Sequence, residues 1–135
     1  MSNIPSTLAL ALIRIVLLLG VLMFGALTMF VQGQDTWMPA PPETLERLRY
    51  VGVGVWAVAI LMVLLLRTRG MPPEGRAGAA TPSIIGWAIG EAVALFGGVY
   101  YFLSGSGEWY LLGVMFLAAT FIVFPIPRSS GRPGP

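Results

Sequence analysis

The sequence contains neither cysteine nor histidine, and only 10% of its 135 residues are charged. The two missing residue types exclude disulfides, thiol chemistry and metal sites built on thiolate or imidazole ligands, and they remove the usual protein ligands of haem and chlorophyll. We therefore expect no cofactor bound through histidine or cysteine, and we expect bound lipids instead.

Lysine is absent as well, so all eight basic residues are arginines, and the net charge is only +2. A charge this small, scattered along the chain, does not indicate nucleic-acid binding. The sequence also lacks a glycine-rich phosphate loop after a strand and a nucleophile paired with a base. We therefore expect a protein that is not an enzyme.

Hydrophobic residues make up 56% of the chain, against roughly 45–50% in an ordinary soluble domain. Since a membrane-spanning helix needs about 20 mostly apolar residues, four apolar runs indicate four spans. They are residues 7–31, 50–66, 83–103 and 109–124. We predict an all-α integral membrane protein, with four transmembrane helices in one compact antiparallel bundle over residues 1–127 and a polar tail at 128–135.

The ends of two runs carry further signals. Pro41 and Pro42, followed by Glu43 and Thr44, predict that the second helix begins before its apolar part. The first run is too long for a signal peptide and has no basic segment before it, so we expect a retained helix.

The arginines are distributed unevenly between alternate connections. Two lie on one side, at Arg47 and Arg49, and the other side has Arg14, Arg67, Arg69, Arg76, Arg128 and Arg132. The positive-inside rule then places both termini in the cytoplasm, and we expect a bacterial cytoplasmic membrane. Aromatic side chains of the kind that anchor helices at membrane surfaces gather at the opposite ends of the predicted helices: Trp37, Tyr50, Tyr100, Tyr101, Trp109 and Tyr110.

Small residues recur at helical spacing in the third apolar run. Separated by three or four positions, they share one face of a helix and let another helix approach closely. They are Gly86, Gly90, Ala94, Gly97 and Gly98. We expect this face to be a packing surface that places the third helix centrally in the bundle, or that docks other integral membrane subunits or a second copy of the chain.

One carboxylate, Glu91, lies beside this face and within the apolar run. An ionisable side chain at such a position indicates a functional site, and it faces the bundle interior or a subunit interface. The segment IIGWAIGEAVALFGGV, Ile84 to Val99, resembles the carboxylate-bearing helix of the ATP synthase proteolipid, subunit c. The resemblance implies that Glu91 corresponds to the carboxylate that binds a proton or a sodium ion.

Arg14 is the other charge within an apolar run, and two interpretations are open for it. Counted from Thr7, it lies ~10 Å into the membrane, and Glu91 lies ~12 Å in from Ser83. At similar depths the two can form an ion pair that joins the first and third helices. Alternatively, Arg14 extends its side chain to the cytoplasmic headgroups.

These observations leave three functional hypotheses. The leading one is a small non-catalytic accessory or scaffold subunit of a larger respiratory, photosynthetic or other energy-transducing membrane complex. The alternative is an ion-binding proteolipid with Glu91 as the ion carrier. A transporter or channel needs a polar path, for which the runs supply only Arg14, Thr28, Glu91 and Thr120.

Overall fold

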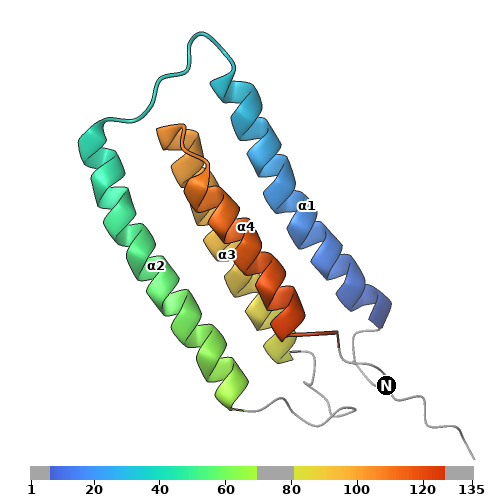
Figure 1. Cartoon of the computed structure of the whole chain (residues 1–135). Coiled ribbons are helices and arrows are strands. Elements are labelled where there is room, and N and C mark those ends of the chain that lie inside the picture. Colours follow the sequence, from blue (N-terminus) through green and yellow to red (C-terminus); the bar gives the residue numbers. More distant parts are fainter. Residues whose placement is uncertain (1–6, 70–80, 127–135) are drawn as a thin grey trace, which may run out of the picture.

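The computed structural model describes residues 7–69 and 81–126, and these form four helices and no strand. The helices follow one another up and down, as Figure 1 shows. Their bounds are α1 Thr7–Gln32, α2 Pro42–Thr68, α3 Thr81–Ser104 and α4 Glu108–Val123. The all-α class is therefore confirmed, and the predicted tail at 128–135 lies outside the described residues.

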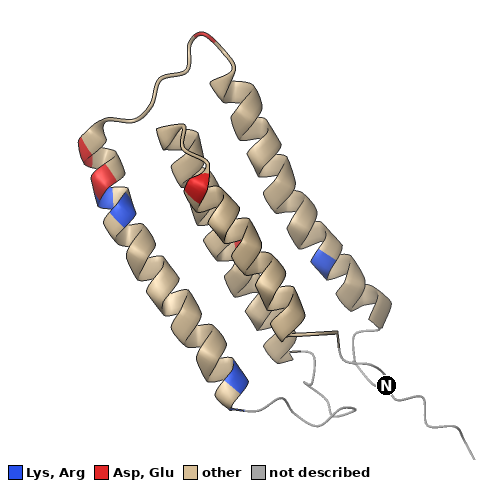
Figure 2. Ribbon diagram, in the orientation of Figure 1, with Lys and Arg blue, Asp and Glu red and all other residues tan. Residues whose placement is uncertain are grey.

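Three of these helices, α1, α2 and α3, are long and apolar enough to cross a membrane, as expected of an integral membrane protein. α4 is apolar as well, but it has only 16 residues. Figure 2 shows that charged residues gather near the ends of α2, and that the stretch between them carries none.

The helix ends follow from local chemistry. α2 begins at Pro42, where proline fixes the backbone angle of the first turn, and Glu43 places a negative charge there. The predicted helix entry at the two prolines is thereby confirmed. Gly105 has a φ of 77° and forms the tight turn from α3 to α4, which most other residues cannot do without strain.

α3 is the central element, because it packs against each of the other three helices. Figure 1 shows α3 and α4 side by side in the middle, with α1 and α2 on opposite sides. Half of the most apolar part of α3 is buried, whereas less than a fifth of that of α1 or α2 is. Exposed apolar faces of this kind suit contact with lipid.

The connection from α1 to α2 is tied to the C-terminal end of α3. Three consecutive main-chain carbonyls in the last turn of α3 each receive a hydrogen bond from the end of α1 or from this connection, and that of Tyr101 also accepts one from the Gly105 amide. Gln32 Nε2 donates to the carbonyl of Tyr101 at 2.6 Å, Trp37 Nε1 to that of Phe102 at 3.2 Å, and the Ala40 amide to that of Leu103 at 2.8 Å. These bonds hold one end of the bundle together.

Candidate functional site

The small residues of α3 face α4 at very close range. A methyl group added at Gly90 would lie 2.6 Å from Thr120 Oγ1 and 3.0 Å from Leu117 Cα, and one added at Gly97 would lie 2.8 Å from the main-chain carbonyl carbon of Trp109. The same holds on the α4 side, where a Cβ added at Gly113 would lie 2.6 Å from Ala94 Cα. The two backbones can come this close only because these side chains are missing or small.

The remaining two members of the small-residue face meet aromatic rings. Gly86 accommodates the ring of Phe124, which follows α4, and Gly98 accommodates the ring of Phe24 from α1. The face is therefore covered within the chain, mostly by α4. The expectation that this face packs the third helix within the bundle therefore fits the structure, and the face is not open to another chain.

Arg14 of α1 reaches the C-terminal end of α4. Its guanidinium donates a hydrogen bond to the main-chain carbonyl of Phe121. The guanidinium carbon lies 4.8 Å from the ring centroids of both Trp87 and Phe121, so that it also makes cation–π contacts. A cation at the C-terminal end of a helix complements the negative end of the helix dipole.

Three further side chains donate to carbonyls at this end of α4. Arg67 donates to the carbonyl of Val123 at 3.3 Å. Trp87 Nε1 donates to the carbonyl of Phe124 at 2.8 Å, and Ser83 Oγ to that of Pro125 at 3.3 Å. α1, α2 and α3 each thus contribute donors to carbonyls that have no partner within α4.

Glu91 lies on the side of α3 that faces α1, and it is half-buried. Its Oε1 is 3.9 Å from the position where a Cβ on Gly20 would be. Among residues 7–69 and 81–126 no hydrogen bond or ion pair engages it, and Arg14 does not come within the 4.0 Å of an ion pair. Within the described residues, the ion pair with Arg14 that was one of two interpretations does not form, and no other cation engages this carboxylate.

The aromatic residues predicted as surface anchors have different environments. Tyr50 is 72% exposed, whereas Tyr100 is buried against Trp109, with 5.6 Å between ring centroids. Tyr101 stacks on Tyr110 at 5.9 Å, and Tyr110 donates a hydrogen bond to the carbonyl of Val21 at 2.8 Å. Most of these predicted anchor residues therefore also pack helices together.

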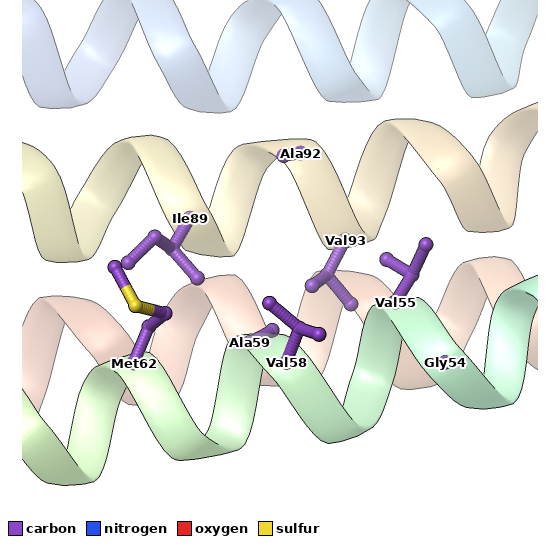
Figure 3. A pocket seen from close by; sticks show the side chains of 8 residues that line it. All are labelled: Gly54, Val55, Val58, Ala59, Met62, Ile89, Ala92 and Val93. Carbon is purple, nitrogen blue, oxygen red and sulfur yellow. The ribbon is translucent and has the colours of Figure 1, made fainter.

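An apolar groove of about 430 Å³ separates part of α2 from α3, and Figure 3 shows the side chains around it. A Cβ at Gly54, on the α2 side, would have no other atom within 4 Å. The walls are formed by Val55, Val58, Ala59 and Met62 from α2 and by Ile89 and Val93 from α3. Sequence reasoning missed this groove, because hydrophobicity alone does not say where two helices separate.

Within the described parts of the chain, no three acidic, histidine or cysteine side chains are placed to hold a metal ion. Among residues 7–69 and 81–126, the charged groups within the apolar parts of the helices are Arg14, which donates to a carbonyl, and Glu91, which none of these residues pairs. Comparison with protein families, curated proteins and solved structures finds no match to this chain.

Proposed function

We propose that this chain is a small, non-catalytic accessory or scaffold subunit of a larger complex in a bacterial cytoplasmic membrane. An energy-transducing complex of the respiratory or photosynthetic kind is the host that we favour. In this proposal all four helices lie in the membrane, α4 included, and both termini are cytoplasmic, in agreement with the distribution of arginines.

The apolar groove between α2 and α3 is the observation that carries this proposal. Both of its walls are apolar, and its volume of about 430 Å³ can receive several side chains of another helix. Gly54 and Ala92, at its border, leave room for close approach of a backbone, which is how membrane helices commonly associate. We infer that a transmembrane helix of a partner subunit packs here, in place of the covered small-residue face of α3.

Extraction in mild detergent followed by native mass spectrometry tests the proposal. The wild-type chain is expected to be recovered with a partner in a fixed ratio. Gly54→Leu fills the groove and is expected to release the partner, whereas Ala57→Leu, which introduces the same side chain at an exposed position of α2 outside the groove, is expected to retain it. Recovery of the wild-type chain alone under gentle extraction would count against the proposal.

Glu91 supports a second candidate, an ion-binding proteolipid similar to ATP synthase subunit c. The supporting observation is a half-buried carboxylate on a central helix that no described residue engages. This candidate predicts a ring of identical chains, and modification of Glu91 by a hydrophobic carbodiimide that sodium ions or a change in pH prevents. If Glu91 is not modified in native membranes, or if no homo-oligomer forms, the proteolipid hypothesis is wrong.

A further inference from the structure

A partly polar hollow of about 270 Å³ lies between the first turns of α2 and the start of α4, and it shares no lining residue with the groove described above. Glu46, Arg49 and Tyr50 of α2 line it, and Trp109 of α4 contributes to it. It therefore combines one acid and one base with two aromatic side chains.

Both charges in this hollow are available to a ligand. Neither Glu46 nor Arg49 makes a hydrogen bond or an ion pair within residues 7–69 and 81–126, and both are exposed. Arg14 and Arg67, in contrast, donate to main-chain carbonyls at the other end of the bundle. The hollow thus presents a free carboxylate and a free guanidinium, three residues apart on one helix.

A second hollow, also of about 270 Å³, continues the first toward the middle of the bundle. The two share Val53 and Trp109, and the second adds Trp56 and Leu112. Its surface is almost entirely apolar. The two hollows therefore form one site with a charged end and an apolar end.

The charged end lies at the level of lipid headgroups. α2 has 27 residues and is thus ~40 Å long, ~10 Å longer than the hydrocarbon layer of a bilayer. If Arg67 marks one membrane surface, the opposite surface falls ~30 Å back along the helix, close to Arg47. Tyrosine and tryptophan side chains are common at this level.

We propose that this site binds a phospholipid with a zwitterionic headgroup that contains a primary ammonium, such as phosphatidylethanolamine. Arg49 binds the phosphate, Glu46 accepts hydrogen bonds from the ammonium, and an acyl chain lies along Val53 and Leu112. Phosphatidylglycerol lacks a cationic group that could neutralise Glu46, and a choline headgroup has no N–H to donate to it.

The test measures binding to the purified full-length chain by native mass spectrometry, with phosphatidylethanolamine, phosphatidylcholine and phosphatidylglycerol of identical acyl chains. Phosphatidylethanolamine is expected to bind most tightly. Arg49→Gln is expected to weaken its binding about tenfold, as for loss of a hydrogen bond to a charged group. Glu46→Gln is expected to remove the preference over the other two lipids.

Matched controls lie on the same turns of α2. Arg47→Gln and Glu43→Gln change the same charges outside the hollow and are expected to leave binding as in the wild type. Equal binding of the three lipids to the wild type would overturn the proposal, as would equal effects of Arg47→Gln and Arg49→Gln. The outcome does not depend on the partner subunit or on an ion bound by Glu91.

Discussion

Arg14 of α1 donates a hydrogen bond to the main-chain carbonyl of Phe121, in the last turn of α4. With 16 residues, α4 is ~24 Å long, shorter than the ~30 Å hydrocarbon layer. In the proposed membrane arrangement, a helix of this length packed along α3 does not reach both membrane surfaces. Its last carbonyls would then need donors from the protein, since lipid supplies none, and Arg14 is one such donor.

We expect Arg14→Met to destabilise the fold by about 1–3 kcal/mol, because the carbonyl of Phe121 and the negative end of α4 lose their charged donor. Arg67→Met is the matched control. Its exposed side chain donates to Val123 at 3.3 Å, and a change within about 0.5 kcal/mol is expected. Unfolding in a detergent series measures both, and equal stability of the two variants would contradict the role of Arg14.

Gly97→Ala is expected to destabilise the fold by about 1–3 kcal/mol, because the new methyl group meets backbone atoms that cannot move aside. It would lie 2.8 Å from the carbonyl carbon of Trp109 and 2.9 Å from Tyr110 Cα. Gly54→Ala makes the same chemical change where no atom lies within 4 Å. There the greater helix propensity of alanine stabilises the helix by up to ~1 kcal/mol. Thermal unfolding measures both variants. An equal loss of stability in the two would rule out close packing at Gly97 as the cause.

Much of the fold could be predicted from the sequence. Helices follow from apolar runs of about 20 residues, since in a membrane every main-chain group must bond within the helix. Spacing of three and four also placed the small residues of α3 on one packing face. Spacing does not say which helix covers that face, however, and α4 fills it within the chain.

The partner of Arg14 could not be predicted, because depth along two helices depends on where each begins. Arg14 lies seven residues beyond Thr7, and Glu91 lies ten beyond Thr81, where α3 begins. The difference of three residues is nearly one turn. Arg14 is therefore level with Trp87, and Glu91 lies beside Gly20 farther along α1.

A double-mutant cycle tests this offset. Arg14→Met and Glu91→Gln are expected to change the free energy of unfolding additively within about 0.5 kcal/mol, because the two side chains share no contact. Unfolding of the wild type, both single variants and the double variant gives the coupling. A coupling energy well above this value would support the Arg14–Glu91 ion pair, one of the two interpretations that the sequence left open.

Tyr110→Phe is expected to destabilise the fold by about 0.5–1.5 kcal/mol, the usual net contribution of one hydrogen bond. The hydroxyl of Tyr110 donates to the carbonyl of Val21 at 2.8 Å and joins α4 to α1. α1 and α4 otherwise make few contacts, so this bond is one of the links that set their distance. Tyr50→Phe is the control, because Tyr50 is 72% exposed and its hydroxyl makes no hydrogen bond with the described residues. If both variants unfold at the wild-type temperature, the hydroxyl of Tyr110 does not hold these helices together, and the stacking of its ring on Tyr101 accounts for its position instead.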